Sequence, residues 1–209
     1  MDINVSEYDR LAKEIYAPVY PVIAEQIKQK TGITEGVCVD LGCGGGYLGI
    51  ALAKITNLTV NLFDLHPEMQ IICERNILEH GLAGRATAVL GDVHDLPFLD
   101  QSMDLVISRG SIFFWDDLAK AFQEIYRVLA PGGKTLLGGG FGTPELLAQI
   151  TEKMKQIDGN TSWMESVRKR LGPSTKDNFS AMLEKAGIPD YKIEQSEIEL
   201  WVIMSREMA

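Results

Sequence analysis

Short apolar runs alternate with amphipathic stretches along most of the chain. Apolar runs bounded by turn residues predict buried strands, which we expect at residues 37–40, 58–64, 85–90, 105–108 and 135–138. Between the last two runs, apolar side chains recur at helical spacing, at Leu118, Ala121, Phe122, Ile125 and Leu129. Strands that alternate with helices predict an α/β fold with a parallel, doubly wound sheet.

The helices expected between and around these strands cover residues 8–30, 47–55, 67–80 and 175–186, and a further one follows Asp116 or Asp117 as its cap. Pro18 and Pro21 are expected to interrupt the first of them, because proline removes a backbone donor. Gly81 is expected to end the third.

The last two predicted strands, residues 191–196 and 198–205, are separated by almost no connecting residues. So short a connection forces a hairpin, because parallel strands need a long crossover. We therefore expect a Rossmann-like sheet of seven strands, mostly parallel, with one antiparallel strand in a C-terminal hairpin.

About thirty residues between the fifth strand and the helix at 175–186 exceed what this fold requires. Their amphipathic pattern indicates helices, which either cover the sheet or form a cap over a substrate. The chain is thus expected to be one domain over residues 1–209, divided into N-terminal helices (1–34), a cofactor-binding core (35–142), a helical cap insertion (143–173), and a last helix with the hairpin (174–209).

The first predicted strand ends in Asp40 and continues into a glycine-rich turn at residues 42–46. Glycines allow the backbone to pass close to a ligand, and the helix that follows directs free amides to the same place, which is typical of a nucleotide site. A carboxylate about 5 Å from a pyrophosphate costs about 3 kcal/mol per charge pair at an effective dielectric near 20. Asp40 therefore favours a ligand with an ammonium-bearing tail over NAD.

Five segments in this order carry a resemblance to a known family: residues 37–46, Asp64 after the second strand, and residues 91–98, 103–108 and 127–134. With them the chain resembles the class I S-adenosylmethionine-dependent methyltransferases, and among these the small-molecule enzymes related to quinone-biosynthesis C-methyltransferases. The resemblance covers nearly the whole chain. It implies S-adenosyl-L-methionine as cofactor and S-adenosyl-L-homocysteine as product.

The resemblance implies roles for residues of the turn and the second strand. Asp40 is expected to engage the amino group of the cofactor, or else to cap nearby backbone amides. Asp64 is expected to accept both ribose hydroxyls, since its two oxygens match a vicinal diol. The backbone at Gly42, Cys43 and Gly44 is expected to approach the methionine tail, and Gly46 either contacts the cofactor or only enters the helix.

The resemblance also implies an adenine site. Asp92 is expected to accept from the exocyclic amine while the amide of Val93 donates to the ring. Leu65 and Met69 are expected to sandwich the base, although Met69 suits the core equally well. Ser108, at the end of the fourth strand, is expected to contact the cofactor near the methyl group.

Four residues are expected to contact the acceptor: Tyr8, Tyr16, Arg109 and Phe113. Each has a plainer explanation, namely packing for the aromatic rings and a surface or ion-paired position for Arg109. An Asn/Asp-Pro-Pro-Tyr signature, frequent in enzymes that methylate amino groups of DNA bases or glutamine, is missing after the fourth strand.

Composition narrows the class of protein. The 209 residues suit one domain, the formal net charge of −9 argues against a nucleic-acid partner, and no 18-residue apolar run predicts a membrane span. The N-terminal residues lack the pattern of a signal peptide, which predicts a cytoplasmic location. The cysteines (Cys38, Cys43, Cys73) and histidines (His66, His80, His94) have no metal-binding spacing, so reduced thiols and no metal are expected.

The function implied is methyl transfer to a small-molecule acceptor by direct in-line displacement. Such a reaction requires alignment and exclusion of water, so no covalent intermediate and no catalytic base are expected. Three alternatives stay open: a non-catalytic S-adenosylmethionine-binding sensor or subunit, a related enzyme such as an aminopropyl transferase, and an NAD(P)-dependent oxidoreductase, whose fingerprint Gly44-x-Gly46-x-x-Gly49 matches formally.

Overall fold

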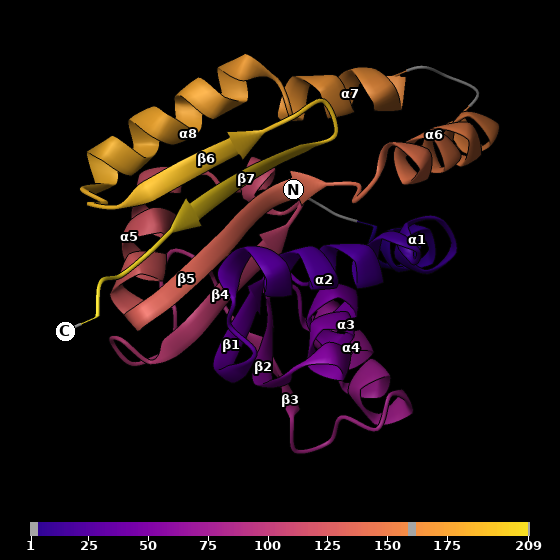
Figure 1. Ribbon diagram of the computed structural model, residues 1–209. Coiled ribbons are helices and arrows are strands. Elements are labelled where there is room, and N and C mark those ends of the chain that lie inside the picture. The colour runs from indigo at the N-terminus through magenta and orange to yellow at the C-terminus, as the bar shows by residue number, and fades with distance from the viewer. Residues whose placement is uncertain (1–3, 159–161, 209) are drawn as a thin grey trace.

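A seven-stranded sheet with the strand order β3-β2-β1-β4-β5-β7-β6 forms the centre of the molecule (Figure 1). The computed structural model describes residues 4–158 and 162–208. The strands are β1 (Glu35–Leu41), β2 (Asn57–Asp64), β3 (Ala86–Leu90), β4 (Met103–Arg109), β5 (Leu129–Gly140), β6 (Tyr191–Gln195) and β7 (Glu199–Met204).

The strand β7 runs antiparallel to the other six strands of this sheet: it pairs antiparallel with β5 and with β6, whereas the pairs among β1 to β5 are parallel. The amide of Ser196 donates to the carbonyl of Glu199 at 2.8 Å and closes the hairpin between β6 and β7. The predicted doubly wound sheet with one antiparallel strand is therefore confirmed.

Helices cover both faces of this sheet (Figure 1). The helices α2, α3 and α4 pack on one face, and α5 and α8 on the other. The bounds are α1 (Val5–Leu11), the π-helix η1 (Ala12–Tyr16), α2 (Val19–Thr31), α3 (Tyr47–Ile55), α4 (Pro67–Glu79), the 3-10 helix η2 (Ile112–Phe114), α5 (Leu118–Val128), α6 (Pro144–Asp158), α7 (Ser162–Arg170) and α8 (Pro173–Ala186).

The N-terminal helices break at one of the two expected prolines. Pro18 caps α2, but Pro21 lies inside its first turn and does not interrupt it. Amides in the first turn of a helix have no partner within the helix, so proline is tolerated there. The expected interruption at Pro21 was therefore wrong.

The strand β5 is longer than the sequence predicts, because it begins at Leu129 and includes the turn expected at residues 131–133. The amide of Gly132 donates to the carbonyl of Arg206 at 2.8 Å, and the amide of Arg206 donates to Gly133 at 3.1 Å. This pairing with the C-terminal residues extends the strand, and a local sequence pattern does not predict such a distant partner.

The amphipathic pattern of residues 143–173 produces two helices, α6 and α7, near the carboxyl end of β5 (Figure 1). Among the described residues, two hydrogen bonds connect this segment to the N-terminal helices. The indole nitrogen of Trp163 donates to the hydroxyl of Tyr16 at 3.1 Å, and Lys153 donates to the carbonyl of Glu14 at 3.2 Å. These contacts bring the expected cap insertion against the N-terminal region, while its role as a cap stays a prediction.

Asp104 stabilises the amino end of the sheet. Its Oδ2 accepts a hydrogen bond of 2.7 Å from the amide of Val37. We expect Asp104→Ala to lower the free energy of unfolding by about 1–2 kcal/mol, because the amide loses a charged acceptor. Urea unfolding measures this loss. Asp104→Asn keeps an acceptor oxygen and should lose less, and equal losses for the two variants would contradict this role.

Candidate functional site

The strands β1, β2 and β3 end level with one another at one edge of the sheet. Their register pairs Leu41 with Phe63 and Asp64 with Leu90. The segments that follow these strands therefore lie side by side, as at ligand sites of other parallel α/β sheets. Each of these strand ends carries one of the carboxylates that the sequence singled out: Asp40, Asp64 and Asp92.

The glycine turn after β1 folds over the end of β2. The amides of Gly42 and Cys43 donate to the carbonyl of Phe63 at 2.8 and 3.1 Å. Gly42 and Gly44 have φ values of 63° and 55°, a left-handed conformation that favours glycine. The turn is thus a backbone surface at the point where the ligand is expected.

A side chain at position 42 would meet a second obstacle, because an added Cβ would lie 2.3 Å from Cβ of Ser111. We expect Gly42→Ala to lower the free energy of unfolding by at least about 1 kcal/mol through its positive φ alone. The same substitution should be less costly in a Ser111→Gly background, which removes the close contact. Urea unfolding of the four proteins measures both costs, and equal costs in the two backgrounds would contradict the contact.

Asp64 holds this turn in place. Its Oδ2 accepts from the amide of Gly44 at 2.8 Å, and its Oδ1 accepts from the amide of His66 at 3.0 Å. The ring of His66 also contacts Oδ1, with Nδ1 at 3.2 Å. The carboxylate therefore fixes the glycine turn and the start of α4 in the same orientation in which it would meet a ligand. Its binding of the ribose diol remains a prediction.

Asp40 is buried below the turn, with 2% of its surface exposed, and its Oδ2 accepts from the amide of Gly49 at 2.9 Å. Burial raises the pKa of Asp40 to about 7, and the neighbouring charge of Asp64 adds to the shift. Asp40 also lines a small cavity of about 20 Å³ together with Gly42 and Cys43. The alternative role as a backbone cap is thus present, and Asp40 at the same time faces the predicted tail site.

A second cavity, of about 380 Å³, lies beyond the turn, where the adenine is expected. Its lining includes Gly42, Leu65, Asp92 and Val93, and Leu65 is 59% exposed. The carboxylate of Asp92 accepts from the amide of His94 at 2.9 Å, and this bond lowers the pKa of Asp92. The cavity brings together three of the four residues predicted for the base.

Three other predicted residues lie in packed positions instead. Met69 is 3% exposed and does not line the adenine-side cavity. Ser108 is fully buried, and its hydroxyl bonds that of Ser111 at 2.6 Å. A Cβ on Gly46 would lie 2.5 Å from the side chain of Leu62, so this glycine permits the close packing of α3 on the sheet.

Two thiols lie under the glycine turn. The sulfur atoms of Cys43 and Cys73 are 3.6 Å apart, and the thiol of Cys73 donates to the carbonyl of Gly44 at 3.0 Å. All three cysteines are free in the structure. Burial raises the pKa of Cys43 well above its usual range, so it remains a thiol and supports the turn without charge.

The aromatic and cationic residues predicted to contact the acceptor lie in different places. Tyr8 lies over the glycine turn, where a Cβ on Gly44 would be 2.9 Å from its ring. The guanidinium carbon of Arg109 lies 5.5 Å from the ring centroid of Tyr16, and Arg109 lines the small cavity beside Asp40. Tyr8 and Arg109 thus lie closer to the tail site than the sequence suggests.

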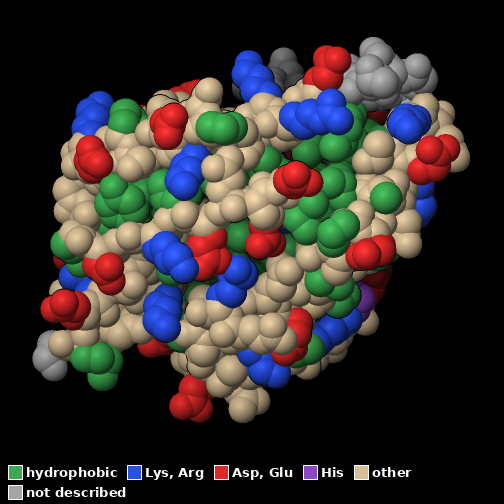
Figure 2. Space-filling model, turned by 45° about the horizontal axis from the view of Figure 1, so that its top comes forward, with side chains coloured by type: hydrophobic (Ala, Val, Ile, Leu, Met, Phe, Trp, Pro, Cys, Tyr) green, Lys and Arg blue, Asp and Glu red, His purple; other side chains and the backbone are tan. Residues whose placement is uncertain are grey.

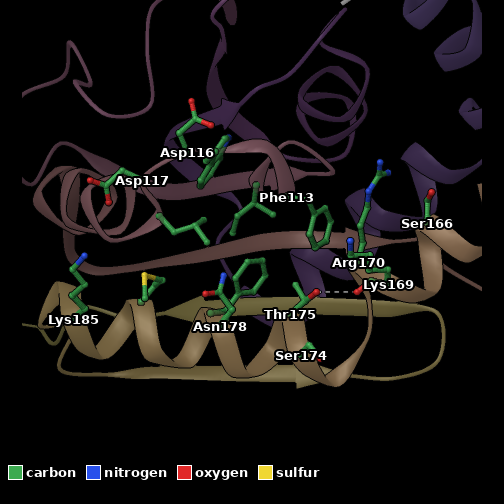
Figure 3. Close-up of a pocket in the computed structure, with 15 residues that line it drawn as sticks. Phe113, Asp116, Asp117, Ser166, Lys169, Arg170, Ser174, Thr175, Asn178 and Lys185 are labelled. Atoms are coloured by element: carbon green, nitrogen blue, oxygen red, sulfur yellow. Dashed lines mark hydrogen bonds between the residues drawn. The ribbon is translucent and has the colours of Figure 1, made fainter. Parts of the chain in front are cut away.

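Phe113 is apart from these residues and lines a larger cavity, of about 840 Å³ (Figure 3). Its ring stacks on Phe179 of α8, with centroids 5.9 Å apart. The close-up shows α8 as one wall of this cavity, with Asp116 and Asp117 opposite. Trp115, Asp116 and Asp117 line both this cavity and the adenine-side cavity, so the two are neighbours.

The sequence does not predict Tyr20 and Tyr47, which also line the small cavity. Their rings stack with centroids 5.5 Å apart, which brings the start of α2 against the start of α3. The hydroxyl of Tyr47 donates to the carboxylate of Asp9 on α1. The position of Tyr47 directly after the glycine turn is the one local signal for its role.

The site suits a nucleoside with a cationic, amino-acid-like tail. A buried carboxylate with a raised pKa gains from a cationic ligand, and an exposed leucine beside Asp92 suits a flat base. Among residues 4–158 and 162–208, no group of three or more histidine, cysteine, aspartate or glutamate side chains is arranged to hold a metal ion. Within the same residues, no helix is long and apolar enough to cross a membrane.

Comparisons with known proteins agree with this fold. A methyltransferase-domain family matches residues 39–137. A solved structure from Methanococcus maripaludis, described as a candidate S-adenosyl-L-methionine-dependent methyltransferase, is 40% identical, with a TM-score of 0.93 over 100% of this chain and 98% of that one.

Among curated proteins, a rice 2-methyl-6-phytyl-1,4-hydroquinone methyltransferase is 28% identical over 158 residues, covering 75% of this chain and 42% of that protein. The demethylmenaquinone methyltransferase of Chlorobaculum parvum is 35% identical over 109 residues, covering 51% of this chain and 42% of that protein. The chain thus spans less than half of the length of these two relatives. Together with the fold and the strand-end carboxylates, these matches show that the chain belongs to the S-adenosylmethionine-dependent methyltransferases.

Proposed function

We propose that this protein transfers the methyl group of S-adenosylmethionine to a small-molecule acceptor by direct in-line displacement. The observation that carries the proposal is the row of carboxylates at the ends of β1, β2 and β3 around a glycine turn. Paired phosphates would be repelled there, whereas a sulfonium nucleoside with an ammonium group is attracted. This arrangement favours the methyltransferase over the NAD(P)-dependent alternative.

S-adenosylmethionine is the cofactor of the family, and when bound it supplies an electrophilic methyl group. Asp40 would hold its amino group, Asp64 the ribose, and Asp92 with Val93 the adenine, beside Leu65. Gly42 and Gly44 keep the backbone free of side chains at that place. Tyr8 covers the turn from outside and excludes water, which strengthens each of these polar contacts.

No side chain is assigned as a general base. The two histidines nearest the site are each engaged with a carboxylate, since Nδ1 of His66 lies 3.2 Å from Asp64 and Nδ1 of His94 lies 2.6 Å from Asp92. Both therefore support the ribose and adenine contacts, away from the expected methyl position. The chemistry then depends on alignment of the acceptor with the methyl group.

The cavity of about 840 Å³ is the proposed acceptor site, because it adjoins the adenine-side cavity. Phe113, Trp115, Phe179 and Met182 give it apolar and aromatic walls, and its rim carries both acidic and basic side chains (Figure 3). This lining supports an acceptor with a flat or apolar body. On the face drawn in Figure 2, basic and acidic side chains are interspersed, which with the net charge of −9 argues for a small molecule over a nucleic acid.

The test is transfer of a labelled methyl group from S-adenosylmethionine to a pool of small metabolites, combined with calorimetry of cofactor binding. We expect labelled product and tight binding of S-adenosylmethionine and S-adenosylhomocysteine. Tight binding without any transfer would favour the non-catalytic sensor. Tight binding of NADH without S-adenosylmethionine would overturn the proposal.

A further inference from the structure

The small cavity beside the glycine turn has opposite charges on its walls. Asp40 contributes a carboxylate from the end of β1, and Arg109 contributes a guanidinium from the end of β4. We propose that Arg109 binds the carboxylate of the cofactor's amino-acid tail, so that Asp40 and Arg109 together select a zwitterion. This assignment rests on the proposed function, and it moves Arg109 from the acceptor to the cofactor.

Arg109 is held firmly in position by its surroundings. Its Nε donates to the carbonyl of Gly140 at 2.9 Å. Its guanidinium carbon lies 5.5, 5.6 and 5.7 Å from the ring centroids of Tyr16, Tyr20 and Phe141, respectively. Three aromatic faces and one carbonyl restrain the side chain, which reduces the entropy that it loses when it binds an anion.

The two terminal nitrogens of Arg109 remain available for a ligand. Among residues 4–158 and 162–208, neither Nη1 nor Nη2 has a hydrogen-bond partner, and no ion pair joins Arg109 to Asp40. The charge of Arg109 nevertheless reaches into the cavity, because it opposes the burial that raises the pKa of Tyr20. A half-buried guanidinium with free donors suits a carboxylate, which its planar fork binds through two oxygens.

The position of this charge decides between the cofactor and the acceptor. Arg109 shares its cavity with Asp40, Gly42 and Cys43, which belong to the glycine turn. It does not line the large cavity proposed for the acceptor. A zwitterionic tail would pair with both charges at once, whereas a carboxylate of the acceptor on Arg109 would leave the carboxylate of the tail beside Asp40 without a cation.

The cavity is too small for the tail in this conformation. About 20 Å³ holds roughly one water-sized probe, so Tyr8 must move outward when the cofactor enters. Tyr8 is 45% exposed and belongs to α1, a helix of seven residues, so it is well placed to do so.

The experiment compares two ligands that differ by one carboxylate: S-adenosylhomocysteine and its decarboxylated analogue, S-adenosyl-3-thiopropylamine. Calorimetry measures the affinity of wild-type protein, Arg109→Met and Arg109→Lys for each ligand. We expect Arg109→Met to weaken the binding of S-adenosylhomocysteine by about tenfold, because a partly buried ion pair is lost. The binding of the analogue should be nearly unchanged. The affinity of Arg109→Lys for S-adenosylhomocysteine should lie between those of the wild type and Arg109→Met, since lysine keeps the charge but not the planar guanidinium.

Arg206→Met is the matched control, because this arginine also lies over an aromatic ring, 4.1 Å from the centroid of Tyr126, and donates to a backbone carbonyl, but lines none of the three cavities. It should bind both ligands as the wild type does. If Arg109→Met lost the same affinity for both ligands, or lost none for either, the assignment of Arg109 would be overturned. The proposed function would still stand. Wild-type protein that binds neither ligand would overturn the proposed function as well. Circular dichroism of each variant shows whether it is folded. If Arg109→Met does not fold, the comparison of the two ligands with Arg109→Lys still decides the question.

Discussion

Asp64→Ala is expected to weaken the binding of S-adenosylhomocysteine by about 30-fold or more, equivalent to about 2 kcal/mol. Two contributions add in this variant. The predicted bonds to the ribose hydroxyls are charge-assisted, and the same carboxylate holds Gly44 and His66 through their amides. Loss of the carboxylate therefore removes ligand contacts and also releases the glycine turn.

Calorimetry at pH 7 measures this loss, with Glu68→Ala as the control. Glu68 is an exposed acid on the first turn of α4, so its removal changes the net charge by the same amount without touching either cavity. Asp64→Ala with wild-type affinity would discard the ribose assignment. An equal loss of affinity in Glu68→Ala would mean that the effect comes from the change in net charge and not from contacts of Asp64.

Cofactor affinity is expected to fall about 50-fold between pH 7 and pH 5, because Asp40 must be ionised to bind an ammonium group. The pKa of Asp40 is raised to about 7 in the free protein. Below that pH the ligand must displace a proton, which lowers the affinity by about tenfold per pH unit. Asp92 does not contribute in this range, since its pKa is lowered.

Calorimetry at several pH values separates the wild type from Asp40→Asn, which cannot ionise. The variant should bind more weakly at pH 7 and show little dependence on pH. A pH dependence equal to that of the wild type would mean that another group titrates. The decarboxylated analogue keeps the amino group and should show the wild-type dependence.

Asp40 also makes the stability of the fold depend on pH, and this dependence runs opposite to that of cofactor binding. The folded pKa of about 7 lies above the usual value for an aspartate, so the folded state binds the extra proton more tightly. The contribution of Asp40 to stability is therefore complete at about pH 4 and below and is lost as the pH rises through 7. Bound cofactor should restore stability at neutral pH.

The sequence predicts those parts of the site that follow directly from strand ends. Asp40, Asp64 and Asp92 each come after an apolar run, and parallel strands bring their ends to one edge of the sheet. The turn was predictable because its glycines are needed where the backbone has positive φ, as at Gly42 and Gly44. The local sequence pattern and the order of the parallel strands together determine where these carboxylates and glycines lie.

Other positions depend on how distant elements pack. Met69 lies on the face of α4 that packs into the core, so it is buried. The hydroxyl of Ser108 bonds that of Ser111 below the turn. Tyr20 and Tyr47 meet only because α2 packs against α3. Arg109 lines the same cavity as Asp40 for the same reason, since the rings around it come from the N-terminal helices and from Phe141, the residue after β5.

The hydrogen bond between Trp163 and Tyr16 has a consequence for the order of events in turnover. Tyr16 follows α1 in the π-helix η1 and packs on Arg109, so we expect a shift of the N-terminal segment that admits the cofactor to reach α7. The helix α7 in turn supplies Lys169 and Arg170 to the cavity of about 840 Å³ that we propose for the acceptor. Steady-state kinetics should accordingly show a compulsory sequence, in which the methyl donor associates first and the demethylated nucleoside dissociates last.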